Sequence, residues 1–298
     1  MARTEEIALS HLDTAAPKIF ATLDQTKGVF SVRDLEAIFQ SSVLEWGLPD
    51  RTKVSRWLEY LQTKGSLRKL TLQAKGYTPL VRYVWGDVSA YRLAALLWKG
   101  AYLSHGSAVF LHGLTDDIPK TIYVNREQSP KPAPAGGLTQ ERLDMAFSRP
   151  QRASAYVLAV DDFRIVMLSG KNTGRLEVGE APDPSDESRL LPVTRLERTL
   201  IDIVVRPAYA GGVTRLVDAF QGAAPRVSVP LLVATLRQLG YIYPYHQALG
   251  FLLERAGVDR AQLHPLLELG MEFDFHLVHG MRERDYDPSW KLFIPKGL

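Results

Sequence analysis

The stretch of sequence that decides the fold is RTKVSRWLEYLQTKGSLRKLTLQAKGYTPLVR, residues 51–82. Apolar residues recur at helical spacing over residues 52–64, and Gly65 follows them as a helix stop. Over residues 66–85, apolar and polar residues roughly alternate on both sides of an Ala-Lys-Gly turn at 74–76, which is typical of a strand pair. The segment therefore predicts a helix followed by a β-hairpin.

The same segment concentrates the positive charge of the protein. It holds eight Lys or Arg and one acidic residue, Glu59, a local charge of +7, whereas the whole chain has 36 basic and 33 acidic residues. Residues 86–298 are balanced, with 24 basic and 24 acidic residues. A neutral protein that gathers its cations on one short segment is expected to bind a polyanion there. The competing interpretation is a solvated basic face, which is what most charge runs are.

Two further helices are expected before this segment. One covers about residues 16–23, and the other covers about residues 31–39, where Ser31 and Asp34 have the spacing of a capping box. The order helix, helix, basic helix, basic hairpin is typical of a winged helix-turn-helix. In that fold the third helix enters the DNA major groove, and the hairpin, or wing, contacts phosphates or a neighbouring minor groove. Residues 1–86 are therefore expected to form a DNA-binding domain.

The candidate DNA-binding residues lie on both of the basic elements. If about six phosphates are neutralised, the logarithm of the affinity should fall with the logarithm of the salt concentration with a slope of about −5. The candidates are, on the helix, Lys53, Arg56 and Tyr60 as groove contacts with Lys64 beside them, and, on the wing, Arg68, Lys69, Lys75 and Arg82.

Residues 87–298 are expected to form a larger mixed α+β domain, a small sheet followed by helices, so the whole chain is predicted to be of the α+β class. Residues 180–188 (EAPDPSDES) are expected to be an acidic loop, Thr194 and Glu197 to form a capping box, and the tail from Asp285 to be irregular. The expected strands are 121–125, 153–160, 163–168 and 190–193, and the expected helices are 90–98, 104–112, 195–205, 214–220, 230–239, 246–256 and 261–268.

Three segments of this second part resemble the AbiEi family of antitoxins. They are YLSHGSAVFLHGL at 102–114, PVTRLERTLIDIVVRP at 192–207 and YPYHQALGFLLERAG at 243–257. The most specific part is Arg198-Thr-Leu-Ile-Asp202. Many members of the family have a shorter DNA-binding domain than this chain, in which the connection and wing occupy residues 40–85.

The resemblance implies a bacterial toxin–antitoxin or abortive-infection protein. Such antitoxins join an N-terminal winged helix to a C-terminal domain that is needed for neutralisation. They repress their own promoters by binding repeated operator sequences in double-stranded DNA, and their partners are nucleotidyltransferase-type toxins. The resemblance thus implies an autoregulating transcriptional repressor that needs no catalytic residue and no cofactor.

Three arginines of the family-like segment are candidates for a second surface that contacts DNA or a toxin: Arg195, Arg198 and Arg206. Arg198 and Asp202 are four residues apart on the predicted helix, so they can also pair with each other. A structural ion pair is the more common use of such spacing.

Several classes of protein lack their signatures in this chain. There is no cysteine, which excludes disulfides and cysteine-ligated metal sites. The N-terminus has no apolar signal segment, and no apolar run approaches about 18 residues, so a cytoplasmic protein without a membrane partner is expected. There is neither a G-x-S-x-G elbow nor a P-loop, and residues 170–174 (GKNTG) are interpreted as a turn. None of the 12 lysines follows an acidic residue by two positions, as nuclease sites usually require.

Two weaker features keep other readings open. Asp161 and Asp162 could bind a metal, although an acidic hairpin turn is the simpler interpretation, and His276 and His279 have a spacing that can ligate zinc. The leading hypothesis remains an antitoxin and autorepressor. The alternatives are a ligand-responsive winged-helix regulator and, less favoured, a nuclease with a winged targeting domain.

Overall fold

The computed structural model describes residues 2–26, 28–132 and 136–298, and the side chains from residue 10 onward within these ranges. The chain divides into two compact units. The first comprises residues 1–99 with 158–161, and the second comprises residues 100–157 with 162–298. Each unit has its own hydrophobic core. The first unit continues past residue 86, because the Arg82 side chain donates a hydrogen bond to the carbonyl oxygen of Leu97.

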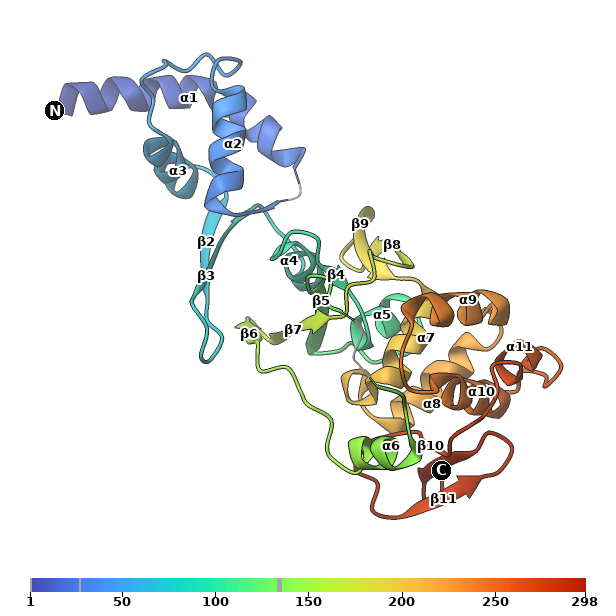
Figure 1. Ribbon diagram of the computed structural model, residues 1–298. Helices are drawn as coiled ribbons and strands as arrows, with labels where there is room; N and C mark the ends of the chain where they lie inside the picture. The colour runs from blue at the N-terminus through green and yellow to red at the C-terminus, as the bar shows by residue number, and fades with distance from the viewer. Residues whose placement is uncertain (1, 27, 133–135) are drawn as a thin grey trace. The chain divides into compact units, whose positions relative to one another are not determined.

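The first unit has the element order of a winged helix. Its three strands form an antiparallel sheet in the order β1-β3-β2, and the β2–β3 hairpin extends beyond the helices α1 to α3 (Figure 1). The elements are α1 (Ala2–Asp24), β1 (Val29–Phe30), α2 (Val32–Ser42), α3 (Val54–Thr63), β2 (Leu67–Leu72), β3 (Leu80–Trp85) and α4 (Ala90–Leu96). The predicted basic helix and hairpin are therefore confirmed as structural elements.

Local sequence signals explain how α2 begins and how α3 is held. The predicted capping box is present: the Asp34 amide donates to Ser31 Oγ at 3.3 Å, and the Ser31 amide donates to Asp34 Oδ2 at 2.7 Å. Such a box satisfies two amides that a helix N-terminus would otherwise leave without partners. On α3, Trp57 is fully buried and stacks on Trp46, with 5.6 Å between ring centroids. This aromatic packing fixes which face of α3 turns inward.

The second unit contains a mixed sheet and a helical layer. Within this unit the sheet has the order β7-β5-β4-β9-β8; β5 pairs in parallel with β7 and β4 in parallel with β9, whereas β4–β5 and β8–β9 are antiparallel. The elements of this part are β4 (Tyr102–Leu103), α5 (Gly106–Leu111), β5 (Thr121–Glu127), α6 (Gln140–Phe147), β7 (Phe163–Gly170), β8 (Val178–Asp183) and β9 (Asp186–Thr194), and three of the four residues of β6 (Val157–Val160) belong to the first unit.

Helix α7 is the centre of the helical layer, and eight consecutive residues of it, Glu197–Val204, are buried. A helix buried all round must be packed on every side. The tail folds back: Trp290 is fully buried, and a Cβ placed on Gly250 would lie 2.1 Å from its ring. The remaining elements are α7 (Leu196–Val205), the 3₁₀ helix η1 (Pro207–Ala210), α8 (Val213–Ala223), α9 (Val229–Leu239), α10 (Tyr245–Arg255), α11 (His264–Leu267), β10 (Phe275–His276), β11 (Arg284–Asp287) and β12 (Leu292–Pro295) (Figure 1).

Two expectations about irregular segments were wrong. Residues 180–188 form the end of β8, the turn and the start of β9, and the tail from Asp285 supplies β11 and β12 to a small sheet in the order β10-β12-β11. Residues 186–190 are all exposed, so the start of β9 lacks the apolar alternation that announces a strand. Backbone pairing with β8, and not side-chain burial, gives this segment its structure.

The expected capping box at Thr194 and Glu197 was also wrong. Thr194 is the last residue of β9, and its Oγ1 lies 2.8 Å from Oγ1 of Thr199. Glu197 Oε1 accepts the amide of Ser228 at 2.9 Å, and the N-cap residue of α7 is Arg195. The two side chains of the motif are therefore used for tertiary contacts. Among the described residues, no helix combines the length and the apolar character needed to cross a membrane.

Candidate functional site

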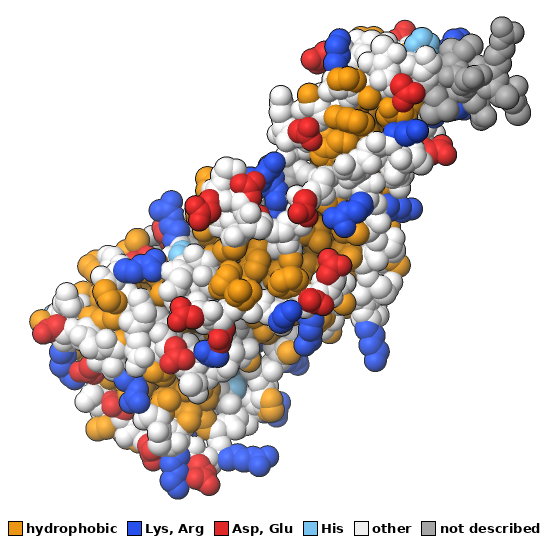
Figure 2. Space-filling view, turned by 180° about the vertical axis from the view of Figure 1, so that it is seen from behind, with side chains coloured by type: hydrophobic (Ala, Val, Ile, Leu, Met, Phe, Trp, Pro, Cys, Tyr) orange, Lys and Arg blue, Asp and Glu red, His pale blue; other side chains and the backbone are white. Residues whose placement is uncertain are grey.

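The basic segment of the first unit presents most of its cations to solvent. Five of the eight residues predicted to contact DNA are exposed: Lys53, Lys64, Arg68, Lys69 and Lys75. Arg51 is exposed as well, which gives six exposed cations on residues 51–75. Arg56 and Arg82 are half-buried, and Tyr60 is buried. On the face seen in Figure 2, by contrast, basic and acidic side chains are intermixed over the second unit.

The proposed groove contact by Tyr60 was wrong. Its side chain is only 4% exposed, and its hydroxyl donates a hydrogen bond to Asp13 Oδ1 at 2.7 Å. Burial and this hydrogen bond raise the pKa of Tyr60 to about 12. Tyr60 is buried because it lies only about 60° around the helix from the buried Trp57. It therefore belongs to the face of α3 that packs against α1.

Arg82, predicted to contact DNA from the wing, is half-buried and bonded inside the first unit. Its Nε donates to the carbonyl oxygen of Leu97 at 2.9 Å, Nη2 donates to the same oxygen, and Nη1 donates to the carbonyl oxygen of Val81 at 2.8 Å. At least three of the five guanidinium N–H donors are thus used inside the first unit. Arg82 is a structural residue that ties the wing to the segment after α4.

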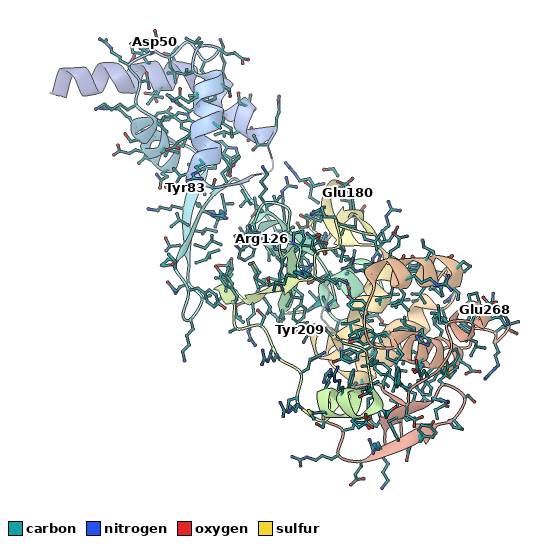
Figure 3. The ribbon with its side chains drawn as sticks, viewed as in Figure 1. Asp50, Tyr83, Arg126, Glu180, Tyr209 and Glu268 are labelled. Carbon is teal, nitrogen blue, oxygen red and sulfur yellow. The ribbon has the colours of Figure 1, made fainter. Side chains whose placement is uncertain are left out.

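The register of the hairpin separates two adjacent wing cations. Lys69 pairs with Tyr83, which is labelled in Figure 3, and both lie on the face that also carries the buried Trp85. Arg68 pairs with Val84 and lies on the opposite face, because successive strand residues alternate. Lys69 is therefore the wing cation that shares a face with the helices, whereas Arg68 points to the other side.

The exposed face of α3 contains polar residues that the charge pattern did not single out. Ser55, Glu59, Gln62 and Thr63 are exposed along it. Gln reads adenine and Glu accepts from cytosine in major-groove recognition, so this face has the chemistry for base readout. A helical wheel could have identified these residues from the sequence. The face opposite Trp57, rather than the face that carries the cations, is the one that indicates which residues of α3 are exposed.

In the second unit, the proposed surface of three arginines is not formed. Arg198 is 4% exposed, and its Nε lies 2.8 Å from Asp202 Oδ1, so the structural ion pair is confirmed and a surface role for Arg198 was wrong. Arg206 is half-buried and donates to the carbonyl oxygen of Arg152 at 3.1 Å. Arg195 is exposed, with its Nε 3.9 Å from Glu177.

A polar network surrounds the Arg198 end of the pair. Arg198 Nη1 donates to the carbonyl oxygen of Leu176 at 2.9 Å. Glu127 accepts the amide of Thr173 at 3.0 Å and the hydroxyl of the buried Tyr102 at 3.1 Å. Burial alone would raise the pKa of Glu127, but the hydrogen bonds donated by Thr173, Arg175 and Tyr102 together outweigh burial and lower that pKa. Thr173 joins this carboxylate to the ion pair, because Arg198 Nη1 donates to Thr173 Oγ1 at 3.4 Å.

The Asp202 end of the pair lines a cavity of about 520 Å³. Asp202 is 4% exposed, and its Oδ2 has no hydrogen-bond partner among the described residues. Burial raises the pKa of this carboxyl, although the charge of Arg198 acts in the opposite direction. Tyr209, labelled in Figure 3, and Tyr241 are aromatic residues of the lining. An unpaired buried acceptor is rare in native proteins, so this cavity is a candidate ligand site.

His105 also lines this cavity, and its backbone is strained. It has φ of +51°, and its Nδ1 lies 2.9 Å from Ser104 Oγ. Burial, together with the charges of Arg198 and Arg206, lowers the pKa of His105 to about 3, which keeps the imidazole neutral. Strained residues of this kind cluster at functional sites.

The histidines and aspartates that suggested a metal site make other contacts in the structure. Among the described residues, no three His, Asp or Glu side chains converge to hold an ion. His276 Nε2 lies 2.8 Å from Asp144 Oδ1, and His279 stacks on Phe147 with 4.1 Å between ring centroids. Asp161 and Asp162 form the turn between β6 and β7, as the simpler interpretation predicted.

Comparison with known proteins bears on the fold. The chain is similar to the crystal structure of the RV2827C protein from Mycobacterium tuberculosis, with a TM-score of 0.53 and 19% sequence identity; the match covers 94% of this chain and 91% of that chain. No family model and no curated protein matches the sequence. At this identity the likeness shows a common fold over nearly the full length of both chains.

Proposed function

We propose that this protein is a DNA-binding repressor of its own promoter and the antitoxin of a nucleotidyltransferase-type toxin. The observation that carries the DNA-binding part is the set of six exposed cations that flank the third helix and lie on the wing of a winged-helix unit. Helix and wing are the two elements with which such domains contact DNA. The antitoxin part rests on the AbiEi-like segments, of which the Arg198–Asp202 core is the most specific.

Within this proposal the cations and the polar face of α3 have different roles. Lys53, Lys64 and Lys69 contact phosphates and set the affinity for any duplex. Glu59 and Gln62 contact bases and set the preference for the operator. Neutralising six phosphates gives a salt slope of about −5, and each lost phosphate contact flattens that slope by about one.

The test is fluorescence anisotropy with the full-length protein, its own upstream DNA and a scrambled duplex, at a series of salt concentrations. Lys53→Ala/Lys69→Ala should weaken binding to both duplexes and flatten the slope by about two. Gln62→Ala should reduce the preference for the native duplex by about 1–3 kcal/mol. Arg255→Ala, which removes an exposed cation of the second unit, is the charge-matched control and should bind like the wild type. Binding that ignores sequence and all these variants would overturn the proposal.

The antitoxin part needs its own assay. Co-expression with the product of the neighbouring gene should rescue growth if that product is a nucleotidyltransferase-type toxin. A neighbouring metabolic operon, and no rescue, would favour the alternative of a ligand-responsive winged-helix regulator. The cavity beside Asp202 is the observation that supports this second candidate.

A further inference from the structure

The cavity beside Asp202 lies where sheet proteins commonly bind ligands. It is lined by residues at the carboxyl ends of the parallel strands β5 and β7, including Asn125 and Gly170, and by one face of α7. Ligands of open sheets that contain parallel strands bind outside those carboxyl ends. Gly170 is required there, because a Cβ at this position would lie 2.5 Å from Asn125 Oδ1. All of the lining residues belong to the second unit.

The lining is strongly cationic. Five Lys or Arg and one acid, Asp202, line the cavity, a net charge of +4, and the buried His105 adds no charge. Arg198 is paired with Asp202, but the hydrogen bonds of two other lining cations go to neutral carbonyls: Lys171 Nζ donates to Leu239 at 2.6 Å, and Arg206 Nη1 donates to Arg152 at 3.1 Å. Such bonds fix the side chains without cancelling their charge. The cavity therefore favours an anionic group.

The carboxylate oxygen of Asp202 that has no partner among the described residues favours a hydrogen-bond donor rather than an anion. Asp202 Oδ2 is a buried acceptor without a donor, while Oδ1 is already bonded to Arg198. A ligand that carries an N–H or O–H would satisfy it and remove the cost of its desolvation. Inorganic phosphate would meet the cations but would bring a second negative charge toward Asp202. The ligand must carry its anionic group at one end and its donor at the other.

The volume of the cavity and its aromatic lining limit the class of ligand that fits. A volume of about 520 Å³ is in the range of small-molecule sites and exceeds what a free amino acid or inorganic phosphate fills. Tyr209 and Tyr241 offer ring faces against which a planar base can stack. We propose that this cavity binds a nucleoside phosphate, with the phosphate on Arg152, Lys171 and Arg206 and a base or ribose donor on Asp202. The proposal does not depend on DNA binding.

Isothermal titration calorimetry tests the proposal that the cavity binds a nucleoside phosphate. The full-length protein, without DNA, is titrated with ATP, AMP, adenosine and inorganic pyrophosphate. A nucleotide is expected to bind with a Kd in the micromolar range, and adenosine and pyrophosphate each at least about 10-fold more weakly, because each engages only one end of the site. Failure of both nucleotides to bind at millimolar concentration would overturn the proposal. Pyrophosphate binding as tight as that of ATP would overturn it too, since Asp202 would then take no part.

Two variants locate the site. Asp202→Asn replaces the acceptor Oδ2 with a donor and should weaken nucleotide binding about 10-fold while leaving weak pyrophosphate binding unchanged. Arg152→Glu changes an exposed side chain, so folding should be preserved even where Asp202→Asn is unstable, and it should weaken nucleotide binding by at least about 10-fold. Arg255→Ala should bind nucleotide like the wild type. Wild-type affinity in Arg152→Glu would overturn the assignment of the cavity.

Discussion

Replacing Arg198 by Met should destabilise the second unit strongly. Met fills much of the volume of the Arg stem but leaves Asp202, which is 4% exposed, without its partner at 2.8 Å. The carbonyl oxygen of Leu176 also loses a donor at 2.9 Å. Breaking a buried ion pair by removing one partner costs about 3–5 kcal/mol, because a charge remains buried without compensation. At about 2–4 °C per kcal/mol for a unit of this size, Tm should fall by about 6–20 °C.

Urea unfolding and thermal melting of the full-length protein measure this effect. The double variant Arg198→Met/Asp202→Leu buries no uncompensated charge, so most of the lost stability should return. Lys296→Met is the matched control, because it breaks an exposed pair with Glu283 at 3.1 Å and should change the free energy of unfolding by less than about 1 kcal/mol.

The effect should depend on pH in a defined direction. Burial raises the pKa of Asp202, and loss of the opposing charge of Arg198 raises it further. A group whose pKa is higher in the folded state stabilises the fold below its unfolded pKa, and that stability is lost as the pH rises through the folded pKa. The penalty of Arg198→Met should therefore shrink as the pH is lowered from neutral toward about 4. A penalty below about 1 kcal/mol at neutral pH, with no pH dependence, would refute the burial of this pair.

Three further substitutions test other parts of the structure. Tyr60→Phe removes the hydrogen bond to Asp13 and should cost about 1 kcal/mol in urea unfolding while leaving operator affinity unchanged; a large loss of affinity would restore its role as a groove contact. Gly250→Ala places a Cβ 2.1 Å from the Trp290 ring and should cost about 3 kcal/mol, seen as a lower Tm, and a neutral result would contradict this packing. Lys291→Gly relieves a φ of +46° and should stabilise by about 0.5–1 kcal/mol; a lower urea midpoint would argue against that backbone conformation.

Local signals in the sequence predicted the elements that short-range physics controls. The Ser31–Asp34 capping box is formed by residues three apart, and the basic helix ends where Gly65 follows it. The wing was predicted from alternation about a turn, and the local charge of +7 follows from counting. The Arg198–Asp202 pair was also within reach, because residues four apart on a helix are neighbours in any fold.

Tertiary structure decided which of these residues are available. Tyr60 donates a hydrogen bond to Asp13, which is 47 positions away in the chain, and Arg82 donates one to the carbonyl oxygen of Leu97, which is 15 positions away. These contacts engage both side chains inside the first unit. The sequence placed Arg198 on an amphipathic helix, but only the packing around α7 buries it and leaves Asp202 facing a cavity. A sequence pattern gives the angle of a side chain about its own element. Whether that angle meets solvent or protein depends on elements that are distant in the chain.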